Sequence, residues 1–122
     1  MTTQAYTDEA VRLLSHLIAT PSVSRDERRA ADIMQEALTR YGFTPQREAN
    51  NVWAIAHHYN EARPTLLLNA HLDTVKPVST YTRNPYEPSL EEGILYGLGS
   101  NDCGGGLVSL LQAFRILDSS DS

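Results

Sequence analysis

Hydrophobic residues recur at helical spacing in three stretches of the chain. In the first stretch Thr7 is a suitable N-cap, and Pro21 ends the pattern. In the second, Ser24–Glu27 has the form of a capping box, and Gly42 is a suitable C′ residue. The third follows the glycines that end at Gly106. We therefore predict three amphipathic helices, with the apolar faces Ala10, Leu13, Leu14, Leu17 and Ile18; Ala30, Ile33, Met34, Ala37, Leu38 and Tyr41; and Leu107, Leu110, Leu111 and Phe114 joined by Val108, Ile116 and Leu117.

Between the second and third helices the pattern is typical of strands. Thr65–Val75 starts with a continuous apolar run, which is expected of a strand covered on both faces. Together the elements predict an α/β fold, a mixed β-sheet flanked by helices. The other expected strands and turns are Phe43–Glu48, a turn at Asn50-Asn51, Val52–Ala56, a turn at Glu92-Gly93 and Ile94–Tyr96.

Composition narrows the possible functions. The length of 122 residues suits one domain or a piece of a larger one. The strongly apolar strand expected at Thr65 needs neighbouring strands on both sides. We therefore expect residues 1–122 to be the front part of a longer unit. A net charge of −5 argues against nucleic acid or an anionic membrane as the partner. The start of the chain does not resemble a signal peptide, and one cysteine, Cys103, fits a reducing compartment. We expect a cytoplasmic protein.

The sequence His71-Leu-Asp73 is a candidate metal-binding pair. The two residues are two positions apart, so on an extended backbone their side chains point to the same face. They follow a buried type of strand, and sites in α/β proteins favour the carboxyl ends of strands. Imidazole and carboxylate are common zinc ligands. By itself, however, the short motif is a weak signal.

Asp102 is the second candidate, because it lies among glycines just before a helix. A phosphate site would need the P-loop spacing or G-x-G-x-x-G, and "GLGSNDCGGG" fits neither. A carboxylate at the place of a phosphate is also electrostatically unfavourable. This loop therefore favours a cation.

Several other polar residues have simpler interpretations. His16 falls off the apolar face of its helix and is expected at the surface. His57 and His58 at a strand end are expected to be surface residues rather than a metal pair. Glu91-Glu92 is predicted to lie in a surface turn.

The spaced motifs resemble the M20 family of metallopeptidases and deacylases. The resemblance lies in "NAHLDTVKP" at residues 69–77, "YTRNPYEPSLEEGILYGLGSNDCGGG" at 81–106 and "LIATPSVSRDE" at 17–27. It implies a zinc-peptidase-like catalytic domain, of which residues 1–122 are the N-terminal part. The sequence departs from the commoner family pattern at Leu98 and at Cys103-Gly104, which bears on the surroundings of the site and on substrate preference.

The resemblance also implies roles for individual residues. His71 would be a terminal ligand of one metal, Asp102 would bridge two metals, and Asp73 would be a catalytic-site acid that holds the other ring nitrogen of His71. The cofactor would be two Zn²⁺ ions, with Co²⁺ as an alternative, and the peptide bond after Asp102 would be cis. Cys103 as a thiolate ligand is disfavoured because such sites use oxygen and nitrogen. The general base and the remaining ligands would lie outside this chain.

The implied function is metal-dependent removal of an acyl group from a small-molecule N-acyl amino acid. N-acetylornithine or N-succinylornithine, in arginine biosynthesis, is the expected substrate, and the full-length protein would be a homodimer. The chain by itself would be an inactive fragment. The alternatives are a desuccinylase or dipeptidase of the same family, a metal-free binding module, and a nucleotide-binding α/β domain.

Overall fold

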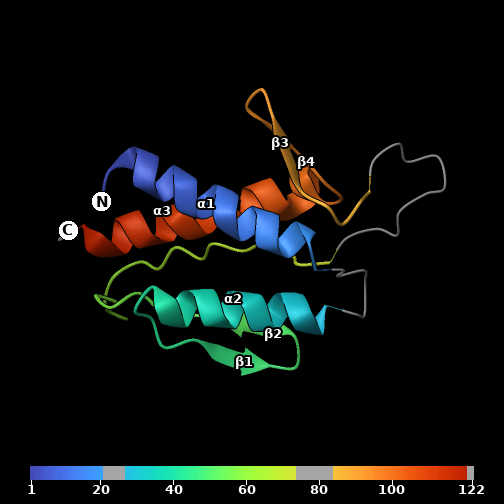
Figure 1. The fold of residues 1–122 in the computed structure, drawn as a ribbon. Coiled ribbons are helices and arrows are strands. Elements are labelled where there is room, and N and C mark those ends of the chain that lie inside the picture. Colours follow the sequence, from blue (N-terminus) through green and yellow to red (C-terminus); the bar gives the residue numbers. More distant parts are fainter. Residues whose placement is uncertain (21–26, 74–83, 121–122) are drawn as a thin grey trace.

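The computed structural model describes residues 1–20, 27–73 and 84–120. Three helices form the body of the molecule, and two short β-hairpins lie on it (Figure 1). Helix α1 runs antiparallel to both α2 and α3. In chain order the elements are α1 (Thr3–Ile18), α2 (Arg28–Arg40), β1 (Gln46–Glu48), β2 (Asn51–Trp53), β3 (Ser89–Glu91), β4 (Ile94–Tyr96), a π-type turn η1 (Ser100–Gly105) and α3 (Gly106–Ser119).

Helix α1 begins earlier than its sequence predicts. Thr2, not Thr7, is the N-cap, and its hydroxyl accepts a hydrogen bond from the backbone N–H of Ala5 at 3.1 Å. The hydroxyl of Thr7 instead donates back to the carbonyl of Thr3 at 3.0 Å within the helix. The predicted apolar face is correct, because Leu13, Leu14 and Ile18 are all buried.

Helix α2 and the β1–β2 hairpin form one unit. The helix ends as predicted, with Gly42 at a φ of 92° just beyond the cap, a conformation that glycine adopts without strain. The guanidinium of Arg47 on β1 binds Asp32 on α2, and its Nε donates to the carbonyl of Ala49 in the hairpin turn at 2.8 Å. This single arginine therefore holds the hairpin on the helix. The predicted capping box at residues 24–27 falls largely outside the described residues.

The β3–β4 hairpin projects from the body beside α1 (Figure 1). The turn at Glu92-Gly93 is confirmed, with both residues at positive φ, but β3 was not predicted. After β4 the chain enters η1, where glycines pack directly against α1. A Cβ on Gly104 would lie 2.6 Å from Leu14 Cδ1, and a Cβ on Gly97 would lie 2.5 Å from Ile18 Cγ2. Close packing onto α1 is thus one reason for the glycines of this loop.

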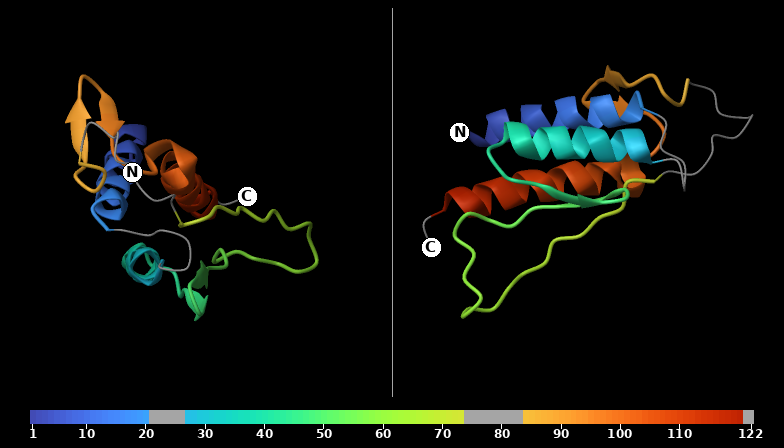
Figure 2. Two further views of the ribbon diagram at one scale, coloured as in Figure 1. Left: turned by 90° about the vertical axis from the view of Figure 1, so that its right-hand side faces the viewer. Right: turned by 90° about the horizontal axis from the view of Figure 1, so that it is seen from below.

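The hydrophobic core lies where the three helices meet. Helices α1 and α3 lie side by side, and α2 with its hairpin covers the remaining side (Figures 1 and 2). The predicted face of α3 is largely confirmed, although Ile116 and Leu117 are exposed. The buried core cluster contains Leu13, Leu14, Ile18, Met34, Ala37, Leu38, Phe43, Leu107, Val108 and Leu111.

The predicted strand at Thr65–Val75 is wrong for the part that the structure describes. Residues 64–73 are extended but belong to neither hairpin, and Leu66 and Leu67 are 74% and 83% exposed. A strand exists only when another strand pairs with it, and among the described residues none does so. For the same reason the predicted mixed sheet is replaced here by two separate antiparallel pairs.

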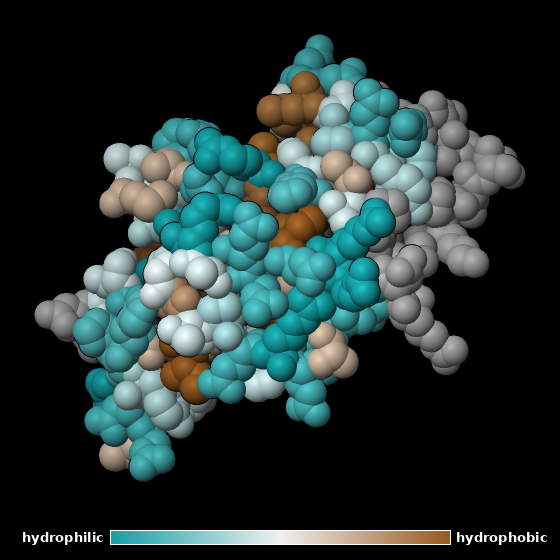
Figure 3. Space-filling view, turned by 60° about the horizontal axis from the view of Figure 1, so that its bottom comes forward, coloured by the Kyte–Doolittle hydropathy of each residue, from teal (hydrophilic) through white to brown (hydrophobic). Residues whose placement is uncertain are grey.

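One face of the molecule is mainly hydrophilic. On the face shown in Figure 3, hydrophobic residues form separate small patches within a hydrophilic surrounding. Within residues 1–20, 27–73 and 84–120, none of the helices combines the length and the apolar character required to cross a lipid bilayer.

Candidate metal site

His71 and Asp102 come together from distant parts of the chain. The extended segment 64–73 carries His71, and η1 carries Asp102, 31 residues later. The Nε2 atom of His71 lies 3.1 Å from Oδ1 of Asp102. Both side chains are open to solvent, 49% and 87% exposed respectively. An imidazole nitrogen and a carboxylate oxygen are thus presented side by side at the surface.

Asp73 lies on the opposite edge of the same imidazole ring. Its carboxylate Oδ1 is 3.2 Å from Nδ1 of His71, and its backbone carbonyl is 3.0 Å from that nitrogen. A carboxylate at this position fixes the orientation of a histidine ring and makes its free nitrogen more basic. The relation expected from the two-residue spacing is therefore present in the geometry.

The loop that carries Asp102 has an unusual backbone. The peptide bond between Asp102 and Cys103 is cis, as the family resemblance implies. Both residues depart from helical angles, so the carboxylate of Asp102 leaves the turn toward His71. The Cys103 thiol donates to the backbone carbonyl of His71 at 3.2 Å, so its sulfur contacts the segment that carries the imidazole.

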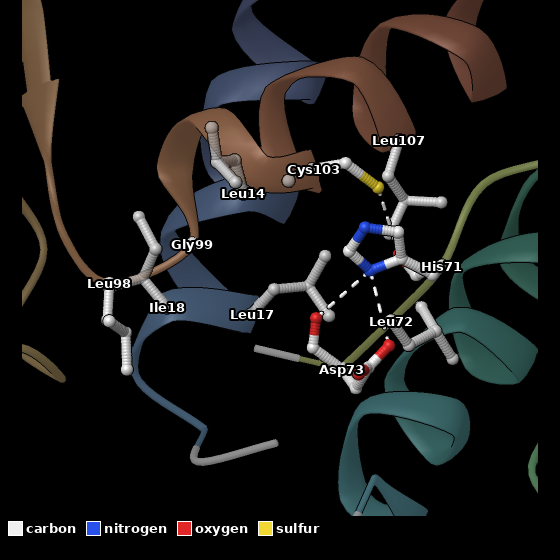
Figure 4. A pocket seen from close by; sticks show the side chains of 11 residues that line it. Leu14, Leu17, Ile18, His71, Leu72, Asp73, Leu98, Gly99, Cys103 and Leu107 are labelled. Carbon is white, nitrogen blue, oxygen red and sulfur yellow. Dashed lines mark hydrogen bonds and ion pairs between the residues drawn. The ribbon is translucent and has the colours of Figure 1, made fainter. Parts of the chain in front are cut away.

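Apolar side chains form the wall behind these polar groups. Figure 4 shows His71 and Asp73 beside leucine and isoleucine side chains, with the Cys103 sulfur directed toward the His71 backbone. This wall lies beside His71 and Asp73, whose polar groups remain open to solvent on the other side. It is formed by Leu14, Leu17 and Ile18 of α1, Leu107 of α3, and Leu72 and Leu98.

Negative charge dominates the site. Among the described residues, the carboxylates of Asp73 and Asp102 both have His71 as their ion-pair partner. Burial lowers the pKa of His71, but the hydrogen bonds to Asp102 and to Asp73, with the two carboxylate charges, raise it by more. The pKa of His71 therefore lies above its ordinary value of 6.5. Two carboxylates around one imidazole favour a positive charge at this position.

The donors present fit one edge of a zinc site. Two ligands about 2.0–2.1 Å from a tetrahedral ion are separated by roughly 3.3 Å, close to the distance between His71 Nε2 and Asp102 Oδ1. The described part of the chain offers no group of three histidine, cysteine, aspartate or glutamate residues suited to a metal. These residues thus supply a pair of donors, and a complete site needs further ligands.

The other predicted positions lie away from this pair. His16 is exposed on α1, as expected, and Glu91 and Glu92 are exposed at the end of β3 and in the turn after it. His57 and His58 are also exposed, but His57 binds Asp118 at the end of α3, an interaction that the sequence analysis missed. A separation of 61 residues leaves no local signal for such a pair.

The geometry defines a class of site in which a histidine, His71, lies between two carboxylates. All three side chains are accessible from solvent, so a cation could reach them. Comparison with known proteins identifies relatives of this part of the chain. The sequence pattern of Peptidase family M20/M25/M40 matches residues 67–122, which include His71, Asp73 and Asp102. The chain belongs to this M20 family.

Curated relatives extend the match to most of the chain. A protein of Anaplasma marginale named succinyl-diaminopimelate desuccinylase is 30% identical over 120 residues, which cover 92% of this chain and 31% of the relative. Proteins of the same name from Methylorubrum populi and Xylella fastidiosa are 31% and 30% identical, over 87% and 86% of this chain and 30% and 29% of their own lengths. The chain therefore spans about a third of the length of these relatives.

Proposed function

We propose that the protein containing this chain is a metal-dependent amidohydrolase that removes an acyl group from an N-acyl amino acid. The observation that carries this proposal is the 3.1 Å approach of His71 Nε2 to Asp102 Oδ1, with Asp73 on the other ring nitrogen. Membership of the M20 family supports it independently of the geometry.

His71 and Asp102 would hold the metal, zinc or alternatively cobalt. When bound, the metal acts as a Lewis acid that polarises the substrate carbonyl and activates water for attack. His71 would offer the lone pair of its neutral Nε2 to the metal and keep its Nδ1–H, which would donate a hydrogen bond to Asp73 and so set the tautomer of the ring. Asp102 contributes negative charge at an exposed edge, where it can approach more than one cation.

The substrate that the relatives favour is a succinylated diamino acid. The curated relatives described above all carry the name succinyl-diaminopimelate desuccinylase, which supports the desuccinylase alternative over the expected acetylornithine deacetylase. We accordingly place N-succinyl-diaminopimelate first among the substrates to be tried, with N-acetylornithine as the comparison. The 122-residue chain by itself is expected to lack turnover, because its described residues supply only part of a metal site.

Metal content is the first test. The intact protein should retain zinc after dialysis, as measured by inductively coupled plasma mass spectrometry, and His71→Ala should lose it. His16→Ala is the matched control, since it removes an exposed imidazole from α1 without touching the site. Failure of the wild-type protein to bind any divalent metal would leave the metal-free binding module as the better interpretation.

Hydrolysis is the second test. The intact protein should release succinate from N-succinyl-diaminopimelate, and a chelator should abolish the reaction. Retention of metal without hydrolysis of either acyl amino acid would preserve the metal site but refute the deacylase. Turnover unaffected by chelation would refute metal dependence.

A further inference from the structure

His57 joins three segments that are distant in the sequence. Its Nδ1 lies 2.7 Å from Oδ2 of Asp118 in the last turn of α3, and its backbone N–H donates to the other oxygen of that carboxylate at 2.6 Å. Its Nε2 lies 3.0 Å from the carbonyl oxygen of Gly42, which follows α2. The ring also stacks on Phe43, with centroids 4.9 Å apart and planes at 15°. Phe43 is in turn packed against Phe114 of α3.

The two ring nitrogens of His57 both face groups that can only accept hydrogen bonds. A neutral imidazole has one N–H, so it can donate to Asp118 or to Gly42 but not to both. The imidazolium form has two N–H groups and satisfies both acceptors. The geometry is therefore that of a protonated histidine.

We propose that His57 is a pH-sensitive clamp, which in its protonated form ties the end of α2 to the end of α3 and releases one of these two contacts when it loses a proton. The clamp is separate from the metal site and does not depend on the proposed function. His57 lies at the start of residues 57–71, the stretch that leads to His71. Its partner Asp118 lies at the opposite end of α3 from Asp102, which is in the turn η1 before that helix.

The charges around the cluster favour the protonated form. The hydrogen bond to Asp118 contributes most, followed by that to the Gly42 carbonyl and the charge of Asp118, so the pKa of His57 is raised above 6.5. For Asp118 burial acts in the opposite direction, but the hydrogen bonds from His57 and the charges of His57 and His58 keep its pKa below 3.8.

Helix α2 presents its carbonyl end to His57. Arg40, in its last turn, lies over the ring of Tyr41, 5.4 Å from the centroid. What α2 presents to His57 is the Gly42 carbonyl at the negative end of the helix, which also stabilises a cation.

The sign of the pH effect follows from the raised pKa. A group that binds its proton more tightly in the folded state adds stability at low pH. The contribution of His57 should be complete below pH 6.5 and should disappear as the pH rises through the higher pKa of the folded protein.

Histidine titration by NMR is the direct test. In the protein, the His57 ring should titrate above pH 6.5, and Asp118→Asn should lower the His57 pKa. Titration of the His57 ring at or below pH 6.5, or an unchanged His57 pKa in Asp118→Asn, would overturn the proposal. The wild-type titration is decisive by itself if Asp118→Asn fails to fold.

Stability across pH gives a second readout. The difference in urea midpoint between the wild-type protein and His57→Gln should be largest near pH 6 and should shrink toward pH 9. The matched control, His16→Gln, removes an exposed histidine of α1 that makes neither clamp contact. A difference that stays constant with pH would indicate that His57 acts only by packing on Phe43 and would refute the clamp.

Discussion

Gly104→Ala should destabilise the protein because the backbone leaves no room for a methyl group. An added Cβ would lie 2.5 Å from the carbonyl oxygen of Gly99 and 2.6 Å from Leu14 Cδ1. The same carbonyl accepts a hydrogen bond from the N–H of Gly104 at 2.8 Å, so it cannot move away without weakening that bond. Overpacking of this kind costs about 1–3 kcal/mol of folding free energy.

Gly106→Ala is the matched control, two residues further along the same glycine run. At Gly106 the backbone is helical and a Cβ would meet nothing within 4 Å. Alanine should therefore stabilise the protein, by roughly 0.4–1 kcal/mol, because it restricts the unfolded chain. Both substitutions add the same methyl group. Opposite changes in unfolding free energy would therefore isolate the effect of the room available to that group.

Urea unfolding followed by the fluorescence of Trp53, the one tryptophan of the chain, measures both variants. We expect the unfolding free energies of Gly104→Ala and Gly106→Ala to differ by about 1.4–4 kcal/mol, with the first variant below the wild type. The reasoning is refuted if Gly104→Ala is as stable as the wild type, because the close approach of η1 to α1 would then be incorrect.

Three further substitutions probe separate parts of the structure. Asp73→Asn removes the carboxylate that orients His71, so it should weaken zinc binding by about 10- to 100-fold while leaving the circular dichroism spectrum unchanged. Equal zinc affinity of the variant and the wild type in a competition titration would contradict this. Leu111→Ala should cost about 2–5 kcal/mol in urea unfolding, since this core side chain is 5% exposed, and a loss below 1 kcal/mol would argue against its burial. Arg47→Met should accelerate amide exchange in β1 and β2 but not in α3, because its contacts hold only the hairpin on α2; a uniform change along the chain would show a different role.

The sequence predicted the helices better than the strands. A helix closes its hydrogen bonds locally, so the spacing of Leu13, Leu14 and Ile18 was enough to locate α1 and its buried face. Its start was misplaced because Thr2 and Thr7 are equally good caps, and only the structure shows Thr7 bonded back into the helix. Strand β3 has no period-2 signal of its own and exists because the turn at Gly93 folds it onto β4.

The candidate site was predictable only in part. The two-residue spacing of His71 and Asp73 indicated a shared face, and the structure brings their side chains together. The approach of Asp102 is a contact over 31 residues, which came from the family resemblance and not from any local pattern. No sequence pattern indicated that Cys103 would contact the His71 carbonyl, since that bond depends on how η1 packs on α1.

The extended segment before His71 has a consequence for how the site is assembled. Within the described part of the chain, none of residues 65–70 makes a backbone hydrogen bond, while Leu66 and Leu67 face solvent. An open strand edge of this kind takes its position from whatever strand pairs with it. His71 lies at the end of that segment, where its backbone carbonyl accepts a hydrogen bond from the Cys103 thiol, whereas Asp102 belongs to η1, which packs on α1 through Gly104. A strand that pairs with residues 65–70 should therefore change metal affinity through His71 while the three helices remain folded.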